Sequence, residues 1–303
     1  MKKALITGSL GFAGKHLTAE LLGNGYTVCG IDIEEGAYTA AVDLLDRHAV
    51  RENIRSVQPD VIFHLAAQAA IPLSWKEPQK TFELNVIGTI NILEAVSPEN
   101  QSCTLIIIGS ADQYGYTGSS EPISENEKLL PRNPYAISKK TQEEVALLYA
   151  KTFNLDVRLT RTFNHCGPGQ KPGFLVSDIC LGLVEVEKGV SPCLKVGNLE
   201  AIRDFTDVRD IAAAYRLIYE KGTANEVYNV GSGYGRSAQE VLDSLLSMSN
   251  KEIEVMPDKE RMRVSDTPVF ICDNTKLVNH TGWSPTIPFE KTLYDALEYC
   301  RNL

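Results

Sequence analysis

The amino-acid sequence predicts an α/β protein built on a doubly wound, mostly parallel β-sheet, with a smaller C-terminal part. Three observations support this fold class. Short apolar runs alternate with longer helical patterns through the first half of the chain, which is typical of βαβ units. The apolar runs are nearly continuous, as expected where helices cover both faces of a sheet. The first run also leads directly into a glycine-rich turn.

The elements of the first half follow one another in a regular order. Strands are rich in Val, Ile, Leu and Phe, and each predicted helix shows apolar residues at helical spacing. The expected strands span residues 4–7, 27–33, 60–66, 104–109 and 156–163, and the helices between them span 14–25, 46–58, 78–96 and 133–153. Such alternation predicts that the strands are parallel.

The composition changes after residue 163. Residues 164–173 are rich in Gly and Pro and are expected to form a loop. The later elements are expected to be a helix at 174–189, a strand at 193–197, a helix at 207–222 and a strand at 226–231, and about the last 60 residues are expected to hold short pieces and a final helix at 289–302. We therefore expect a first domain over residues 1–163, to which residues of about 207–231 return, and a second domain made mainly of residues 164–303.

Composition and charge exclude several classes of function. A net charge of −9 over 303 residues argues against a nucleic-acid-binding surface, which needs a basic stripe. None of the seven cysteines forms a Cys-x-x-Cys pair, and the five histidines are not clustered, so no metal site is expected. The apolar run after Met1 is too short for a signal peptide, and no run reaches membrane-spanning length. These features predict a cytoplasmic protein with reduced thiols and no membrane partner.

The first motif with chemical meaning is the turn that holds Gly8, Gly11 and Gly14. It follows a predicted strand and opens a predicted helix. Glycines in this position permit a tight turn and a close approach of the backbone to a pyrophosphate, whose charge then meets the helix N-terminus. The turn predicts a Rossmann-like dinucleotide site.

Asp32 ends the second predicted strand, at the distance from the glycine turn where a carboxylate accepts hydrogen bonds from the adenosine ribose. The same carboxylate repels a 2′-phosphate, so Asp32 predicts a preference for NAD(H) over NADP(H). Asp43 is a second candidate, for contact with the adenine, although an exposed position in a loop explains it nearly as well.

Tyr135 and Lys139 are four residues apart in a predicted helix and therefore share one helix face. A lysine cation beside a tyrosine, together with an oxidised nicotinamide, favours the phenolate and lowers the tyrosine pKa toward neutrality. Such a pair can donate a proton to a sugar oxygen or accept one from it. Ser110, at the end of the preceding strand, is placed to bond the same oxygen.

Together these residues resemble the extended short-chain dehydrogenase/reductase superfamily, whose members modify nucleotide sugars. The motifs that carry the resemblance are "TGSLGFAG", "HLAA" at 64–67, "NVIGT" at 85–89, the serine before "YG", and "YAISK", and it covers essentially the whole chain. It implies that Ser110, Tyr135 and Lys139 are the catalytic triad. It further implies cofactor contacts from Phe12, Ala13, Ile33, Leu44, Leu65, Ala66 and Ala67.

The second half looks like the GDP-sugar branch of that superfamily, and in particular like its reductases of GDP-4-keto-6-deoxy-D-mannose. The motifs are "TRTFNHCGPGQKPGF", "LKVGNLEAIRDFTDVRDI" and "RMRVSD". Arginines suit a diphosphate because their fork of donors bonds two oxygens at once. The substrate contacts that the resemblance implies are Asp112, Asn164, Val196, Asn198, Arg203, Arg263 and Asp266.

The resemblance implies reduction of the 4-keto group to a GDP-6-deoxyhexose such as GDP-D-rhamnose, and a homodimer formed through the helix that bears Tyr135. The reductases often lack an acidic residue at the position of Asp32 and use NADPH, so NADP(H) remains a second cofactor. Three alternatives stay open: a nucleotide-sugar 4-epimerase with tightly bound NAD, a GDP-mannose 4,6-dehydratase, and a non-catalytic protein of the same fold. The last would be expected to lack Tyr135 or Lys139.

Overall fold

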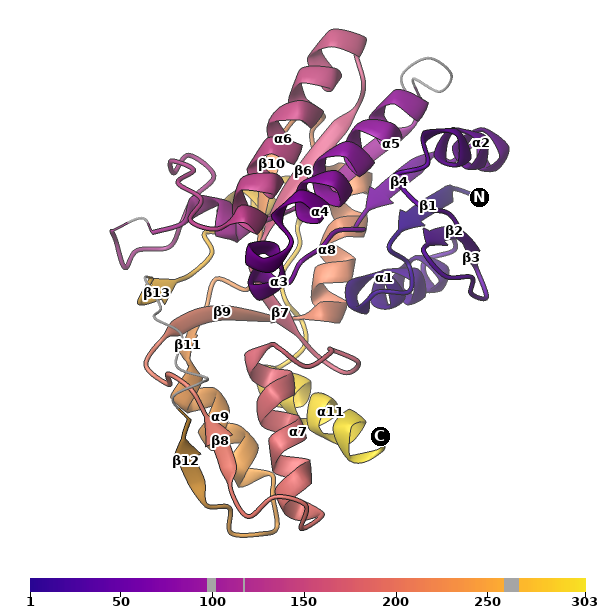
Figure 1. Ribbon diagram of the computed structural model, residues 1–303. Coiled ribbons are helices and arrows are strands. Elements are labelled where there is room, and N and C mark those ends of the chain that lie inside the picture. Colours follow the sequence, from indigo (N-terminus) through magenta and orange to yellow (C-terminus); the bar gives the residue numbers. More distant parts are fainter. Residues whose placement is uncertain (97–101, 117, 259–266) are drawn as a thin grey trace.

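The computed structural model describes residues 1–96, 102–116, 118–258 and 267–303. The chain forms two lobes, one around a large sheet that includes the N-terminal strand and one that holds the C-terminal helix (Figure 1). The predicted α/β fold class is confirmed. Among the described residues, no helix is both long enough and apolar enough to cross a bilayer.

The large sheet has seven strands in the order β10-β6-β5-β4-β1-β2-β3, and all of its neighbouring strands are parallel. The strands are β1 (Lys3–Thr7), β2 (Thr27–Asp32), β3 (Thr39–Ala41), β4 (Val61–His64), β5 (Thr104–Ser110), β6 (Val157–Thr162) and β10 (Val227–Val230). The chain adds β2 and β3 on one side of β1 and then returns to place β4 on the other side. A crevice for a ligand is expected at this reversal, at the carboxyl ends of the strands.

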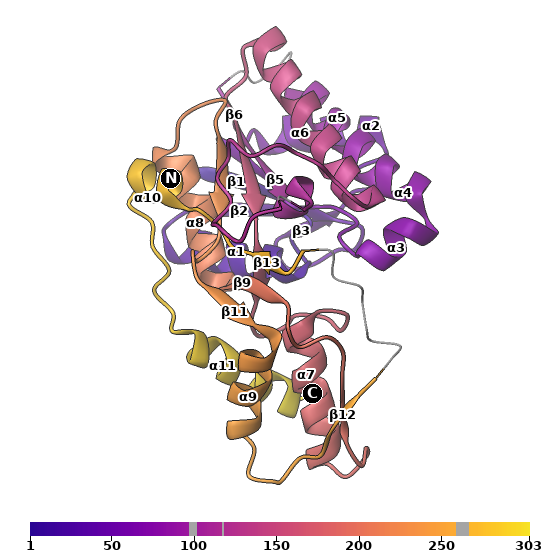
Figure 2. The same cartoon turned by 90° about the vertical axis from the view of Figure 1, so that its left-hand side faces the viewer.

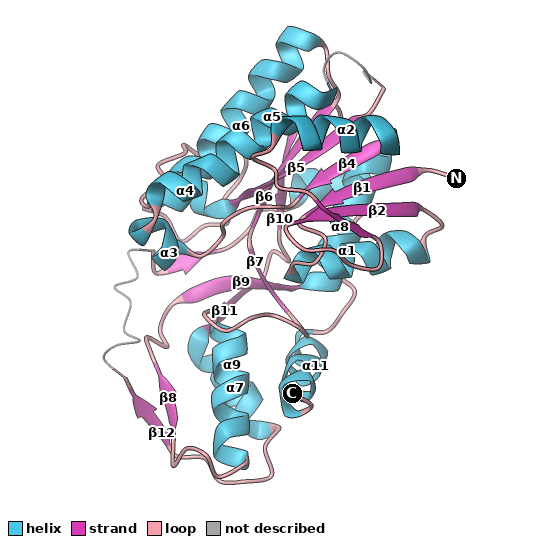
Figure 3. Ribbon diagram, turned by 45° about the vertical axis from the view of Figure 1, so that its right-hand side comes forward, coloured by secondary structure: helices cyan, strands magenta, loops and turns pink. Residues whose placement is uncertain are grey.

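Helices cover both faces of this sheet (Figures 2 and 3). The helices on one face are α1 (Phe12–Gly23), α8 (Val208–Lys221) and α10 (Thr275–Thr281), and those on the other are α2 (Arg47–Val57), α5 (Gly88–Val96) and α6 (Pro134–Phe153). Alternate residues of one strand serve the two cores: Ala4 and Ile6 face α1 and α8, whereas Leu5 faces α2 and α5. α8 and β10 come from the later part of the chain but pack with this lobe.

α6 shows why these residues start and stop helices where they do. The Asn133 side chain accepts a hydrogen bond from the Ala136 N–H, and Pro134 occupies the first helical position, where its missing N–H costs nothing. The helix ends at Asn154, which adopts the left-handed conformation. These caps fix the first turn, and with it Tyr135, relative to the end of β5.

The segment expected to be one helix over 78–96 is interrupted. Helix α4 (Pro78–Phe82) leads into a π-helical stretch (Glu83–Ile87) before α5 begins. Within that stretch, the Asn85 side chain donates to the Gln68 carbonyl and to Ser138 Oγ and accepts the Gln68 N–H. The extra residue in the turn aims Asn85 at the loop after β4 and at α6, which the helical pattern alone does not predict.

The second lobe contains helices α7 (Leu175–Glu187), α9 (Ala238–Ser247) and α11 (Phe289–Arg301), which share one apolar core. Its strands are β7 (Asn164–Cys166), β8 (Leu194–Val196), β9 (Ile202–Asp207), β11 (Gly235–Ser237), β12 (Val255–Pro257) and β13 (Val269–Phe270). β9 is central, because β7, β11 and β13 all pair with it, while β8 pairs with β12.

One expectation for this lobe is wrong in part. The segment 164–173 is not wholly a loop, since it begins with β7, which pairs with β9. In addition, the ten-residue helix α9 begins in residues 232–242, for which no element is predicted from the sequence. Its signal is a capping box, in which Ser237 and Glu240 bond each other's backbone N–H groups.

Candidate active site

The glycine turn after β1 is shaped for close approach by another backbone or by a ligand. Gly8 has φ +70°, and a Cβ there would lie 2.9 Å from the Ala66 backbone. A Cβ on Gly14 would lie 2.2 Å from the Gly8 carbonyl oxygen. Gly11 is the N-cap of α1 and offers no side chain to its first N–H groups. The turn therefore presents backbone donors and a positive helix end, which fits a pyrophosphate.

Asp32 lies at the rim of this turn, at the carboxyl end of β2. Its Oδ2 accepts from the Leu10 N–H at 3.0 Å, and its Oδ1 accepts from the Ile33 N–H at 2.8 Å. Both bonds hold the carboxylate in one orientation and leave it half-buried, with lone pairs available for ribose hydroxyls. Ile33 itself is exposed.

The other residues expected to touch a cofactor lie around the same crevice, with differing exposure. Leu65, Ala66 and Ala67 follow β4 and are half-buried, whereas Asp43 is exposed and caps the Leu45 N–H. Leu44 is buried in the core beneath α2 and α5.

The N-terminal turn of α1 also meets the second lobe. The half-buried ring of Phe12 stacks on His165, with 5.8 Å between ring centroids. His16, one turn further along α1, bonds the Pro168 carbonyl at 2.9 Å. Ala13, which follows Phe12 in the sequence, is half-buried. The loop that follows β7 is thereby held beside the turn where a pyrophosphate would bind.

The three residues expected to be catalytic come together at the carboxyl end of β5. The Tyr135 phenol, in the first turn of α6, lies close enough to Ser110, at the end of that strand, for the serine to lower the pKa of the phenol. One turn later, Lys139 Nζ donates to the Ile108 carbonyl at 2.8 Å. All three residues are buried: Tyr135 is 8% exposed, Ser110 9% and Lys139 3%. Water is therefore largely kept from the hydroxyls and the ammonium.

Burial shifts the acid–base properties of this group in opposite directions. It raises the pKa of Tyr135, with a further contribution from the Asp112 carboxylate, against which the Ser110 hydrogen bond acts. It lowers the pKa of Lys139 to about 7. The protein groups alone thus keep Tyr135 protonated, so the lowering expected from sequence needs the positive charge of an oxidised nicotinamide as well. A protonated phenol suits donation to a sugar oxygen.

Asp112 has a partner that the sequence does not reveal. Burial raises the pKa of Asp112, and the Arg203 guanidinium on β9 opposes that shift. Burial likewise lowers the pKa of Arg203, and Asp112 opposes it. Arg203 also donates to the Ile202 carbonyl at 2.7 Å. A carboxylate beside the phenol and an arginine from the second lobe are therefore electrostatically linked across the two lobes.

The remaining residues expected to bind a substrate are spread over the second lobe. Asn164 is exposed at the start of β7. Val196 and Asn198 line a hollow of about 510 Å³ between the β8–β9 loop and β12. Arg263 and Asp266 lie outside the described residues. The structure thus brings Ser110, Tyr135, Lys139, Asp112 and Arg203 into one neighbourhood and leaves Val196 and Asn198 at a second one.

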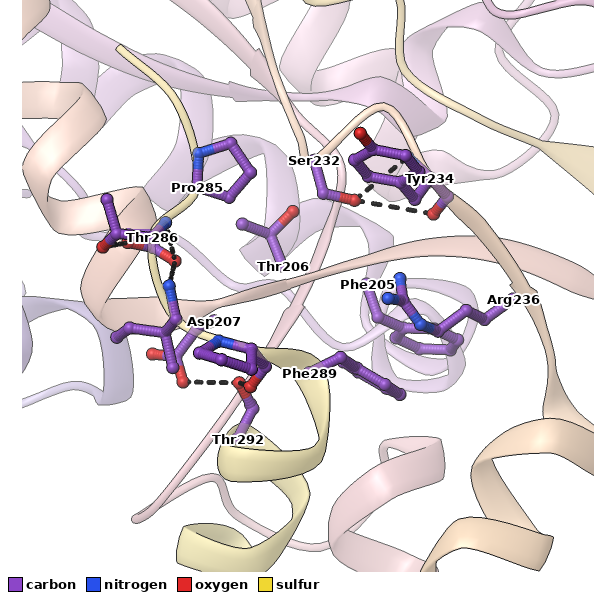
Figure 4. Close-up of a pocket in the computed structure, with 13 residues that line it drawn as sticks. Phe205, Thr206, Asp207, Ser232, Tyr234, Arg236, Pro285, Thr286, Phe289 and Thr292 are labelled. Atoms are coloured by element: carbon purple, nitrogen blue, oxygen red, sulfur yellow. Dashed lines mark hydrogen bonds between the residues drawn. The ribbon is translucent and has the colours of Figure 1, made fainter.

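A smaller cavity of about 240 Å³ lies where the two lobes meet (Figure 4). It contains none of the expected site residues, and its carboxylates already have partners. Asp207 accepts from Thr292 Oγ1 at 2.7 Å, and Asp210 accepts from the Thr286 hydroxyl at 2.8 Å. These bonds tie α11 to β9 and the segment before α11 to α8, so we assign the cavity to the joint between the lobes.

Sequence patterns also miss a set of buried polar residues behind Lys139. The structure connects Lys139 to Gln142, Thr89, His64 and Thr7 by hydrogen bonds. Spacing alone indicates Gln142, three residues after Lys139 on the same helix, and the other three residues stand in the motifs that carry the family resemblance, but nothing in those motifs shows that they bond one another. The other members come from three separate elements, which only the fold brings together.

Comparison with known proteins agrees with this geometry. The GDP-mannose 4,6 dehydratase family pattern matches residues 5–296. The GDP-6-deoxy-D-mannose reductase of Pseudomonas aeruginosa is 33% identical over 96% of this chain and 95% of its own. The UDP-glucose 4-epimerase of Mycoplasma pneumoniae is 29% identical over 99% of this chain and 97% of its own.

Solved structures give the same result. RMD from Pseudomonas aeruginosa, complexed with NADPH, superposes with a TM-score of 0.91 at 31% identity over 100% of this chain and 99% of its own. The Thermus thermophilus UDP-glucose 4-epimerase, complexed with NAD, has a TM-score of 0.87 at 28% identity over 99% of both chains. The chain belongs to the extended short-chain dehydrogenase/reductase family of NAD(P)-dependent enzymes that modify nucleotide sugars.

Proposed function

We propose that the chain reduces the 4-keto group of GDP-4-keto-6-deoxy-D-mannose to a GDP-6-deoxyhexose such as GDP-D-rhamnose. The observation that carries this proposal is the corner after β5, where Ser110 lies beside Tyr135 and is followed by Ala111. The corner has a hydroxyl and a phenol for a carbonyl, but the residue after the serine has no proton to give. The similarity to a GDP-6-deoxy-D-mannose reductase supports the same choice.

The roles of the three residues follow from their donors and their surroundings. When bound, the nicotinamide supplies the hydride that adds to C4 of the sugar. Tyr135 donates its phenolic proton to O4, because its raised pKa keeps that proton in place until negative charge develops on the oxygen. Ser110 donates a hydrogen bond to the same oxygen and orients the carbonyl. Lys139 holds the cofactor ribose and favours the phenolate that remains.

Arg203 is our candidate ligand for the substrate diphosphate, and it interacts electrostatically with Asp112. A phosphate would compete with Asp112 for the guanidinium, since both are anions and the arginine fork suits either. Asn164, Val196, Asn198, Arg263 and Asp266 complete the proposed contacts with the nucleotide sugar. Guanine as the base rests on the GDP-sugar relatives alone.

We propose NAD(H) as the preferred cofactor and NADP(H) as the second one. The support is the fixed carboxylate of Asp32 at the rim of the glycine turn, which would face the ribose and repel a 2′-phosphate. The proposed contacts are the glycine turn and the residues around it: Gly8, Gly11, Phe12, Ala13, Gly14, Asp32, Ile33, Asp43, Leu44, Leu65, Ala66, Ala67, Tyr135 and Lys139.

The 4,6-dehydratase alternative needs more chemistry than this corner offers. After oxidation at C4, a dehydratase must remove a proton from C5 and expel the C6 hydroxyl, which calls for a base and an acid beside the serine. Ala111 can supply neither, and its methyl group is buried at 2% exposure. Asp112 alone remains, and the charge of Arg203 favours its ionised form. We therefore expect no dehydration of GDP-mannose.

The epimerase alternative keeps one observation in its favour. Asp32 suits NAD, and similar epimerase structures contain NAD. A 4-epimerase would purify with NAD already bound and would interconvert two nucleotide sugars without added cofactor. A reductase would oxidise added NADH in proportion to product.

One experiment separates these functions. The purified protein is incubated with GDP-4-keto-6-deoxy-D-mannose and a panel of GDP- and UDP-sugars, each with and without NADH, and products are identified by mass spectrometry and NMR. Our proposal requires NADH-dependent gain of two hydrogens by the 4-keto sugar alone. Cofactor-independent conversion of any sugar to an isomer would favour the epimerase instead.

We also propose a homodimer formed through α6. Ile137 and Leu148 are apolar, are 42% and 62% exposed, and lie three helical turns apart on one face of this helix. A second copy of α6 would cover that face. Light scattering of the wild type and of Leu148→Glu tests this, since a charge in such an interface should favour monomers.

A further inference from the structure

Lys139 is held by two acceptors from the protein. Its Nζ donates to the Ile108 carbonyl at 2.8 Å and to Gln142 Oε1 at 3.0 Å. An ammonium group has three N–H donors and no lone pair. In the described part of the chain these are its two hydrogen-bond acceptors, so one N–H is left for a ligand. The two bonds also fix the direction in which that N–H points.

The Gln142 amide has only one orientation that satisfies its neighbours. Because the ammonium form of Lys139 can only donate, the amide oxygen faces it in that form, and Nε2 then donates to Thr89 Oγ1 at 2.7 Å. Thr89 uses its single hydroxyl proton on the Asn85 carbonyl, at 2.8 Å. Gln142 is 1% exposed and Thr89 is fully buried, so no solvent can replace these bonds.

The same reasoning determines which ring nitrogen of His64, the next residue bonded to Thr89, carries the proton. Since the Thr89 proton is already used, His64 must donate from Nε2, at 2.8 Å. Its Nδ1 then accepts from the Thr7 hydroxyl at 2.7 Å, and Thr7 Oγ1 accepts the Ala66 N–H at 3.1 Å. Burial, with a smaller effect of the Lys139 cation, lowers the pKa of His64 to about 3 and keeps it neutral. Every proton in this chain of bonds therefore has one defined position.

We propose that Gln142 is a positioning residue, which holds Lys139 from behind so that its third N–H faces the bound cofactor. The proposal rests on the proposed role of Lys139 at the cofactor ribose. It assigns to Gln142 two effects on the lysine: it orients the ammonium, and it stabilises the charged form by accepting a hydrogen bond. Through Thr89 and His64 it also joins Lys139 to Ala66, one of the residues that line the cofactor crevice.

The first test measures cofactor affinity in a double-mutant cycle. NADH or NADPH, whichever the wild type binds more tightly, is titrated by fluorescence into wild type, Gln142→Met, Lys139→Met and the double variant. Methionine keeps the length of the side chain but removes its acceptor. We expect Gln142→Met to weaken binding about threefold to tenfold in the presence of Lys139 and to have no effect without it.

Thr281→Val serves as the matched control. Thr281 is buried on α10, away from this site, and its hydroxyl donates to the Leu277 carbonyl and accepts the Trp283 N–H. This variant loses buried hydrogen bonds of the same kind, so it should lower thermal stability and leave cofactor affinity unchanged. An equal loss of affinity from Gln142→Met in both lysine backgrounds would overturn the proposal, because it would show a general structural effect.

The second test compares the pH dependence of kcat in two variants of Gln142, for which we expect shifts in opposite directions. The titratable groups around Lys139 are Tyr135 on its own helix, His64 on β4, and Asp112 at the corner after β5, which acts on Tyr135. The alkaline limb of the kcat–pH profile is assigned to deprotonation of Lys139. Gln142→Met should shift this limb to lower pH, because the ammonium loses a hydrogen-bond acceptor. Gln142→Glu should shift it to higher pH, because a carboxylate favours the cation. Shifts in the same direction would contradict the proposal.

The binding cycle does not need turnover, so it separates this proposal from the proposed reaction. Loss of reductase activity with an intact binding cycle would leave Gln142 as a positioning residue in an enzyme that acts on another sugar. If Gln142→Met does not fold, Gln142→Glu decides the matter: it must retain cofactor binding within about threefold of the wild type. A larger loss would overturn the proposal.

Discussion

Tyr135 in the first turn of α6 lies beside Ser110 at the end of β5, and Lys139, one helical turn after Tyr135, donates to the Ile108 carbonyl of β5. With this arrangement, one sugar oxygen could contact both the Tyr135 phenol and the Ser110 hydroxyl, while the Lys139 ammonium contacts the cofactor ribose. The arrangement depends on side chains that are almost wholly buried, so a small displacement of any of them should lower kcat strongly.

Tyr135→Phe keeps the ring and removes the proton donor. We expect kcat to fall at least about a hundredfold, because general acid catalysis of this kind contributes that much or more. Cofactor affinity, measured by NADH fluorescence, should stay close to that of the wild type, since the ring still fills its place. A fall in kcat of less than about tenfold would mean that Tyr135 is not the acid.

Asp32 is expected to set the choice of cofactor. Wild type should bind NADH more tightly than NADPH, and Asp32→Ala should bring the two dissociation constants together by removing the repulsion of a 2′-phosphate. The variant should also lose some affinity for NADH, because the Leu10 N–H loses its acceptor. Fluorescence titration of both cofactors measures this, and tighter binding of NADPH by the wild type would refute it.

At the scale of single elements, helix α1 offers a matched pair of glycines. Gly14 lies in its first turn, where a Cβ would meet the Gly8 carbonyl oxygen at 2.2 Å, whereas a Cβ on Gly23 at its end meets nothing within 4 Å. Gly14→Ala should therefore displace the glycine turn and weaken NADH binding at least about tenfold. Gly23→Ala should leave affinity unchanged and keep or raise the melting temperature. Similar effects from both substitutions would disprove the role assigned to the turn.

The elements also show what sequence reasoning can reach. The glycine turn, the alternating strands and helices, and the Tyr135–Lys139 pair carry local signals, because each depends on spacing within one segment. The π-helical turn at Asn85 and the pairing of β7 with β9 carry none, since their causes are contacts with other elements. For the same reason, Arg203 could be named as a candidate phosphate ligand from its motif, but its electrostatic interaction with Asp112 could not be predicted.

At the scale of the whole molecule, the buried His64 couples folding to pH. It is neutral in the folded chain, where its pKa is lowered to about 3, and it takes up a proton on unfolding, where its pKa is about 6.5. A lowered pKa in the folded state means that this stability is present above about pH 6.5 and is lost as the pH falls. Between about pH 7.5 and about pH 5.5 the loss from this one group should be about 1.4 kcal/mol.

Urea unfolding at the two pH values measures that loss. The comparison with His64→Asn isolates it, because the other titrating groups are shared by both proteins. We expect the variant to be less stable at neutral pH and to lose less stability on acidification. An equal loss in both proteins would show that His64 is not the buried neutral group described above.

The two lobes together make a nucleotide-sugar enzyme, and the central claim is that this one reduces a 4-keto sugar and does not dehydrate its precursor. The most direct measurement follows the purified protein in two parallel reactions, GDP-mannose with NAD and GDP-4-keto-6-deoxy-D-mannose with NADH, by mass spectrometry. We predict no change in the first, and in the second one NADH oxidised for each sugar that gains two hydrogens. Efficient loss of one water from GDP-mannose, with no reduction of the keto sugar, would contradict the account and make Asp112 the catalytic base.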